Sequence, residues 1–260
     1  MDRSHFSKSG IGALAYGILS YGLFLGVFLY AIGFIGGFLT PTRLDGTQSR
    51  PFWQALAIDL GLLGLFAVQH SVMARPAFKR WWTRFVPEAV ERSTYVLLSS
   101  LALVALFIWW QPIGPSIWNA PVGVARGSVI ALYLFGWALL LYTTFLIDHF
   151  DLFGLKQVWR RLKGHSYRPP QFYTPSLYKV VRHPLYLGWL TIFWAAPTMT
   201  VAHLVFALAT TAYIVIAIQL EEHDLVDAFG ERYASYRRST PMLIPRLWRR
   251  REVQGTAAKA

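Results

Sequence analysis

The sequence predicts an all-α membrane protein: a polytopic helical bundle of four spans, a C-terminal helical hairpin and an amphipathic cytosolic tail helix. First, 55% of the 260 residues are hydrophobic and only 15% are charged, whereas about a quarter of the residues of a soluble domain are charged. Second, the apolar residues form long uninterrupted runs. Third, the cations lie between those runs. We therefore expect residues 1–260 to form one integral membrane domain with five to six membrane helices.

The four predicted spans are apolar runs of about the 20 residues that a bilayer crossing needs. They cover residues 11–39, 52–73, 94–110 and 127–147. The first run is longer than the roughly 7–15 apolar residues of a secretory signal, so we expect it to remain as a helix. Asp59 interrupts the second run. Because a carboxylate facing lipid is costly, we expect Asp59 to face the bundle interior.

The last apolar run, residues 185–220, is too long for one crossing. As a single helix it would measure about 54 Å, against a hydrocarbon core of about 30 Å. Pro197 lies near its middle and disfavours a continuous helix. The run therefore predicts two antiparallel legs. After it, Leu225, Phe229, Tyr233 and Tyr236 share one face of an expected amphipathic helix over residues 222–238.

The charge pattern indicates orientation. The net charge of +12 could suit nucleic acid, but 22 of the 25 cations fall on one side of the predicted bundle. The positive-inside rule then places both termini in the cytoplasm, in a bacterial inner membrane. We expect the lipid bilayer as a partner and no nucleic acid.

The chain has no cysteine, which excludes disulfides and thiolate ligands. The histidines show no close ligand spacing, so we expect no metal.

Two polar segments flank the hairpin. Arg182 and His183 enter the first leg, and Glu221 and Glu222 leave the second. Because antiparallel legs return the chain to one side, these four residues should meet there. Each also has a structural interpretation: a flanking cation is ordinary at a membrane helix, and a glutamate pair can complement a helix dipole. Together they suit a ligand that carries a carboxylate and an ammonium or a diol.

The residues around these segments form a longer joint pattern. It comprises Arg182-His183-Pro184-x-Tyr186-x-Gly188, Glu221-Glu222, Leu225, Phe229-Gly230, Tyr233, Tyr236, Thr240-Pro241 and Ile244-Pro245. This pattern, over about residues 180–245, resembles the C-terminal signature of the isoprenylcysteine carboxyl methyltransferase superfamily. The resemblance implies S-adenosylmethionine (SAM) as the methyl donor. It implies that the donor is bound by Arg182, His183, Tyr186, Gly188, Glu221 and Glu222.

Within this pattern, Tyr186 offers an aromatic face and a hydroxyl group to a ligand. We expect Gly188 to leave room for the ligand beside the backbone. Residues 69–75, 91–95 and 148–154 are in addition similar to bacterial members of the NnrU group. The whole-chain resemblance implies a small thiol substrate, methanethiol, and dimethyl sulfide as the product.

Other functions remain open from the residues alone. Relatives could methylate a prenylated cysteine or a lipid amine, and sterol-type reductases that use NADPH share a similar Arg-His-Pro entry. A non-enzymatic NnrU-like accessory or transport protein is a further alternative. The adjacent Glu221 and Glu222 favour the methyltransferase over the reductase.

Methyl transfer to sulfur is an in-line displacement that needs alignment and a thiolate. We expect His149, oriented by Asp148 or Asp151, to act as the base, since a carboxylate neighbour makes an imidazole more basic. His70, which lies at the cytoplasmic end of the second predicted span, is the second candidate for the base. Either histidine could instead be a purely interfacial residue.

Overall fold

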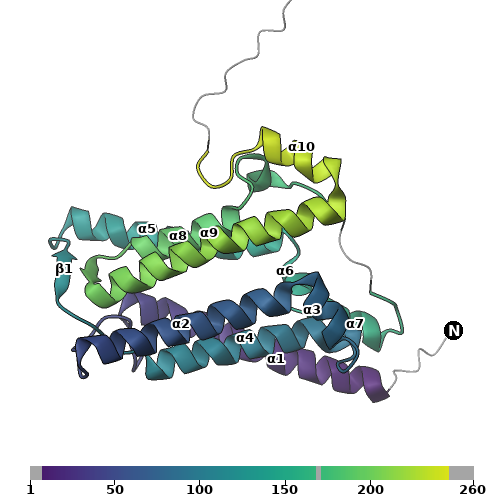
Figure 1. Ribbon diagram of the computed structural model, residues 1–260, viewed down its shortest axis with the longest axis horizontal. Coiled ribbons are helices and arrows are strands. Elements are labelled where there is room, and N and C mark those ends of the chain that lie inside the picture. Colours follow the sequence, from purple (N-terminus) through teal and green to yellow (C-terminus); the bar gives the residue numbers. More distant parts are fainter. Residues whose placement is uncertain (1–7, 168–170, 246–260) are drawn as a thin grey trace, which may run out of the picture.

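The computed structural model describes residues 8–167 and 171–245, which form a helical bundle of two layers (Figure 1). One layer holds α1 (Lys8–Gly36), α2 (Phe52–Ala74) and α4 (Glu88–Trp109), and the other holds α5 (Val124–Leu146), α8 (Pro184–Trp194) and α9 (Val201–Phe229). Within the described residues, five of these helices, all but α8, are long and apolar enough to cross a membrane. The predicted all-α, polytopic membrane fold is confirmed.

The two ends of the bundle differ in chemistry. One end, called the basic end here because Arg75, Lys156 and Arg182 lie there, carries the short helices α3 (Pro76–Trp82), α6 (His149–Leu152), α7 (Leu155–Leu162), η1 (Ser176–Lys179) and α10 (Glu231–Ser239). The opposite, ribbon end carries β1 (Ser116–Asn119) and β2 (Thr198–Thr200), which pair antiparallel with Ser116 opposite Thr200. Residues 1–7, 168–170 and 246–260, whose cations also entered the orientation prediction, lie outside the described residues.

The C-terminal hairpin is present, but its first leg is only partly helical. The 11 residues of α8 span about 16 Å, roughly half of a hydrocarbon core. Residues 195–200 continue to the ribbon end without a helix. The Pro197 carbonyl accepts from the Ala120 N–H at 2.8 Å, and the Ala196 carbonyl accepts from the Trp118 indole at 3.2 Å. Residues in and next to β1 thus donate hydrogen bonds to backbone carbonyl groups that would be bonded within the helix if α8 continued.

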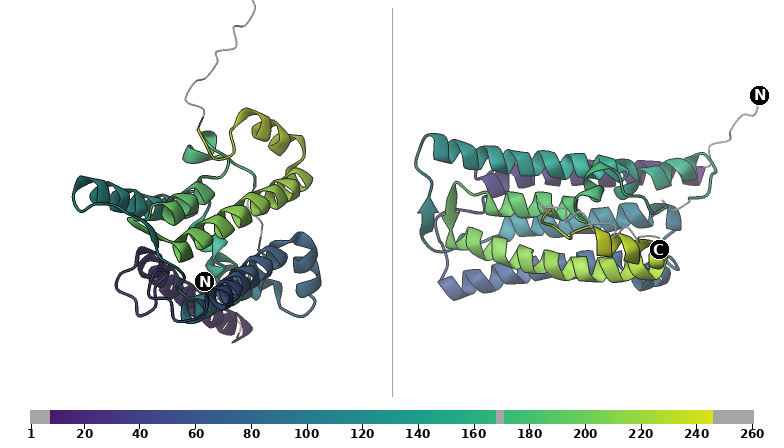
Figure 2. Two further views of the ribbon diagram at one scale, coloured as in Figure 1. Left: turned by 60° about the vertical axis from the view of Figure 1, so that its left-hand side comes forward. Right: turned by 90° about the horizontal axis from the view of Figure 1, so that it is seen from above.

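At the ribbon end, where the two strands lie beside the helices (Figure 2), a histidine fastens this leg. The buried His203 ring lies 3.1 Å from Asp45 Oδ2 through Nδ1 and 3.0 Å from the Phe193 carbonyl through Nε2. The His203 ring therefore joins the 37–51 loop, α8 and α9 through contacts at both of its nitrogens.

Asp59 faces the interior, as predicted. Its side chain is fully buried, and Oδ1 accepts from the Gln111 N–H at 2.8 Å. The carboxylate thereby binds a backbone group just beyond the end of α4 and fastens α2 to it.

The tail departs from the single amphipathic helix predicted over residues 222–238. Gly230 has φ +56°, a conformation that ends a helix readily at glycine. Residues up to Phe229 therefore extend α9, and α10 begins anew. The predicted apolar face is used internally: Phe229, Tyr233 and Tyr236 surround Phe172, with ring centroids 5.4–5.6 Å away. These rings pack against one another and bury Tyr233.

Candidate active site

Glu222 joins the two hairpin legs and the tail. Its buried carboxylate accepts through Oε1 from Arg182 Nε at 2.7 Å and from His183 Nε2 at 3.0 Å. Oε2 lies 3.0 Å from Arg237 Nε. Both oxygens are therefore occupied by side chains of this chain. The expected meeting of Arg182 and His183 with the glutamate pair is observed.

The backbone around Arg182 explains why the tail lies over the hairpin. The Arg182 N–H donates to the Pro241 carbonyl at 2.8 Å, and the His183 N–H donates to the Met242 carbonyl at 3.1 Å. The Arg182 guanidinium also donates through Nη1 to the carbonyls of Arg237 and Thr240. Pro184 then opens α8, where a missing N–H costs no helical bond.

Glu221 is in a different position from its neighbour. Tyr186 donates its hydroxyl to Glu221 Oε2 at 2.9 Å. Within the described part of the chain, Oε1 of this half-buried carboxylate has no hydrogen-bond partner. Of the two glutamates, Glu221 is thus the one with an unoccupied acceptor oxygen among the described residues.

Gly188 has a structural role that differs from the expected one. A Cβ at Gly188 would lie 3.1 Å from the Leu140 nitrogen and 3.2 Å from the Gly136 carbonyl oxygen, both on α5. A Cβ at Gly136 would in turn lie 2.9 Å from Ile192 Cγ1 of α8. The two glycines let α5 and α8 approach closely. The space beside Gly188 is filled by α5 rather than left for a ligand.

His149 is buried at the basic end, but the predicted pairing with Asp148 or Asp151 is wrong. Its Nδ1 lies 2.8 Å from Thr144 Oγ1, and its Nε2 lies 2.8 Å from the Tyr21 hydroxyl. Thr144 already donates to the Leu141 carbonyl, so Nδ1 carries the proton and Nε2 accepts from Tyr21. Burial lowers the pKa of His149, which keeps the ring neutral.

The two aspartates have other partners. Asp148 caps α6 by accepting from the Asp151 N–H at 3.2 Å, and it pairs with Lys156. Asp151 accepts from Gln157 Nε2 at 3.3 Å and from the Tyr167 hydroxyl at 2.9 Å. Burial, then the Asp151 hydrogen bond, raises the pKa of Tyr167 to about 12. Asp148 and Asp151 therefore hold the α6–α7 segment together.

His70 lies in a polar cluster between the layers. Its Nε2 is 2.8 Å from the Tyr95 hydroxyl, and its Nδ1 is 3.2 Å from Ser99 Oγ. The next residue, Ser71, donates to the Tyr213 hydroxyl of α9 at 3.3 Å. One turn further on, Arg75 pairs with Asp224 at 2.9 Å. The end of α2 is thus bonded to both α4 and α9.

This cluster adjoins Glu221. Tyr95 and Tyr213 both lie close enough to Tyr186 to interact with it electrostatically, and Tyr186 holds Glu221. Sequence reasoning missed Tyr95 and Tyr213 because they lie on two separate spans. One signal was available: Tyr213 and Glu221 are eight residues apart and so share a helix face.

Similarity to known proteins gives the class of this chain, an integral membrane methyltransferase. It is 54% identical over 245 residues to methanethiol S-methyltransferase of Crocosphaera subtropica, covering 94% of this chain and 95% of that protein. It is 49% identical over 232 residues to the enzyme of that name from Mycobacterium tuberculosis, covering 89% and 95%. The chain belongs to the methanethiol S-methyltransferase family.

A more distant relative is Nurim of Bos taurus, which is 33% identical over 191 residues and covers 70% of this chain and 72% of that protein. The predicted resemblance to membrane methyltransferases is confirmed. No protein-family model matches the chain, and no solved structure matches it. Among the described residues, no group of three or more potential His, Cys, Asp or Glu ligands could hold a metal ion.

We expect Glu222→Ala to destabilise the protein by about 3–5 kcal/mol, because it leaves the half-buried Arg182 and the buried His183 without their shared carboxylate. Thermal unfolding in detergent measures this. The matched control is Asp227→Ala on the same helix, whose pair with His223 is largely exposed and should contribute little. Equal unfolding temperatures for the two variants would contradict the central role of Glu222.

Proposed function

We propose that this chain transfers the methyl group of SAM to methanethiol and releases dimethyl sulfide. Relatives that carry the name methanethiol S-methyltransferase match about nine tenths of the chain, and this observation carries the proposal. When bound, SAM supplies an electrophilic methyl group, so the protein needs no nucleophile of its own. The task of the protein is to bind the donor, exclude water and provide a thiolate in line with the methyl group.

The donor site is proposed to centre on Glu221 and Tyr186. The free Oε1 of Glu221 suits the ammonium or the ribose diol of SAM, and Tyr186 orients that carboxylate through its hydroxyl. Arg182 and His183 remain candidates for the donor carboxylate, held in place by Glu222. Glu222 thus acts by positioning, while Glu221 contacts the ligand. The motif over residues 180–245 is then a donor-binding unit, with Gly188 packing its first leg.

We propose His70 as the group that takes the thiol proton, ahead of His149. His70 bonds to Tyr95, which lies within electrostatic range of Tyr186. His149 instead bonds to Tyr21 and Thr144, on α1 and α5. In the proposed step, the thiol proton moves to His70. The new S–CH3 bond forms as the bond from the methyl group to the SAM sulfur breaks.

The basic end is proposed to face the cytoplasm of a bacterial inner membrane, with both termini on that side. The cations of the described loops, such as Lys79, Arg84, Lys156 and Arg161, lie at this end, and positive loops favour the cytoplasmic side. This orientation exposes the proposed donor site to cytosolic SAM.

We expect the purified protein to convert methanethiol and methyl-labelled SAM into labelled dimethyl sulfide, detected by gas chromatography with a protein-free control. The same preparation is offered a prenylated cysteine and a lipid amine. Label on either of these without dimethyl sulfide would overturn the proposed acceptor. Binding of NADPH without binding of SAM would overturn the methyltransferase itself.

We expect Glu221→Gln to weaken SAM binding at least tenfold, or about 1.4 kcal/mol, because the ammonium or diol loses a charged acceptor. The unfolding temperature should stay near that of the unmodified protein, since one hydrogen bond from Tyr186 is all that changes. Asp227→Asn removes the same charge from an exposed position of α9 and should leave SAM affinity unchanged. If Glu221→Gln binds SAM normally, Glu221 does not face the donor.

We expect His70→Gln to lower kcat about 100-fold near neutral pH, in the range of general-base effects. The deficit should shrink as the pH rises, because free methanethiol then ionises without a base. His149→Gln is the comparison and should show a deficit that does not depend on pH in this way. A constant deficit for His70→Gln across the pH range would remove His70 as the base.

A further inference from the structure

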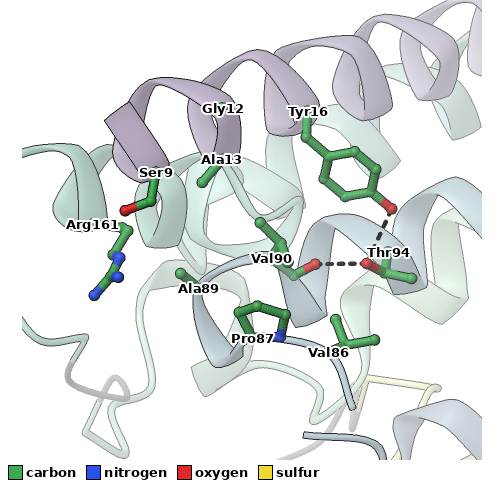
Figure 3. Close-up of a pocket in the computed structure, with 10 residues that line it drawn as sticks. All are labelled: Ser9, Gly12, Ala13, Tyr16, Val86, Pro87, Ala89, Val90, Thr94 and Arg161. Atoms are coloured by element: carbon green, nitrogen blue, oxygen red, sulfur yellow. Dashed lines mark hydrogen bonds between the residues drawn. The ribbon is translucent and has the colours of Figure 1, made fainter. Parts of the chain in front are cut away.

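A cavity of about 480 Å³ lies at the basic end, where residues of α1, α4 and α7 meet (Figure 3). It is open on one side and is bordered by the first turns of α1, by the start of α4 with the residues before it, and by the end of α7. Its lining residues are Ser9, Gly12, Ala13, Tyr16, Val86, Pro87, Ala89, Val90, Thr94 and Arg161. It contains none of the residues assigned to methyl transfer.

The lining is apolar except near the rim. Tyr16 donates to Thr94 Oγ1 at 3.0 Å, and Thr94 donates to the Val90 carbonyl at 2.9 Å, so these hydroxyls are bonded to each other and to the backbone (Figure 3). Arg161 is the one lining residue with a charged side chain. Within the described residues, its exposed guanidinium has no ion-pair partner. The cavity therefore combines an apolar interior with a free cation.

The position of the cavity matches the boundary of a membrane. Ser9 is the first residue of the first candidate span, and Glu88 begins the third. Both spans run from this level toward the ribbon end (Figure 1). The acidic residues in the first turn of α4, Glu88 and Glu91, do not line the cavity. A molecule in the cavity would thus have its apolar part at the depth of lipid tails and its charged part beside Arg161.

We propose that this cavity binds one anionic phospholipid, with an acyl chain against the apolar walls and the phosphate paired with Arg161. Basic pockets between membrane helices at the cytoplasmic face suit such headgroups, and guanidinium–phosphate pairs are strong and directional. Free phosphate would leave the apolar walls unfilled. The bound lipid would hold α7 against α1 and α4, in addition to the packing of Val158 on Gly17.

Gly12 allows a direct test. Gly12 lines the cavity and a Cβ there meets nothing within 4 Å, so Gly12→Leu places an apolar side chain at the cavity wall. Gly22, on the same helix, is equally open but does not line the cavity. Gly22→Leu is therefore the matched control. For the cation, Arg161→Gln is compared with Arg84→Gln, which removes an exposed cation elsewhere at the basic end.

The full chain in detergent is mixed with phosphatidylglycerol or phosphatidylcholine. Bound lipid is counted by native mass spectrometry, and the unfolding temperature is recorded. We expect at least tenfold tighter binding of phosphatidylglycerol and a higher unfolding temperature with it. Arg161→Gln should lose this preference, and Gly12→Leu should lose lipid binding. Both controls should behave as the unmodified protein.

Three results would overturn the proposal. They are equal retention of both lipids by the unmodified protein, unchanged phosphatidylglycerol binding by Gly12→Leu, and the same stabilisation by inorganic phosphate alone. None of these readouts depends on methyl transfer, so the outcome is separate from that of the proposed reaction.

Discussion

One buried carboxylate, Glu222, organises the basic end of this protein. It binds Arg182 and His183 at the start of α8 and Arg237 on α10. An isolated buried charge is very costly, so each partner is held where it can compensate the others. If the hairpin legs separated or the tail moved away, the buried Glu222 carboxylate would lose the side chains that compensate its charge. Glu221 directly precedes Glu222 on α9. The contacts of Glu222 therefore fix the position of the Glu221 backbone and limit where its carboxylate can reach.

The thickness of the bilayer imposes the second constraint. The second leg, from the start of α9 to Glu222, is helical throughout, whereas α8 covers only about half the distance. The extended residues 195–200 cover the remainder, because an extended chain rises about twice as far per residue as a helix. The backbone N–H and C=O groups of an extended segment in this region need hydrogen-bond partners outside the segment. The pairing of β1 with β2 supplies partners at the ribbon end, where the His203 ring also contacts the Asp45 carboxylate and the Phe193 carbonyl.

Apolar run lengths predicted the four spans, and the excess length of residues 185–220 predicted a hairpin that brings positions 182–183 and 221–222 together. Rotation about each helix axis could not be predicted. Adjacent helical residues point about 100° apart, so run lengths alone could not separate Glu221 from Glu222, or show that Gly188 faces α5. The pairing of His149 with an aspartate failed for a related reason. Nearness in sequence indicated contact, but the turn at Asp148, with φ +80°, directs the two side chains to different partners.

Helix α4 connects the cavity with the proposed donor site, because its consecutive residues Thr94 and Tyr95 contact different helices, α1 and α2. Thr94 accepts from Tyr16 in the wall of the cavity at Arg161, while Tyr95 bonds to His70 beside the proposed donor site. A helix is stiff at this scale, so a displacement that widens the gap between α1 and α4 also shifts the Tyr95 hydroxyl. One turn of α4 therefore forms part of the cavity wall and also carries the hydroxyl that contacts the proposed base.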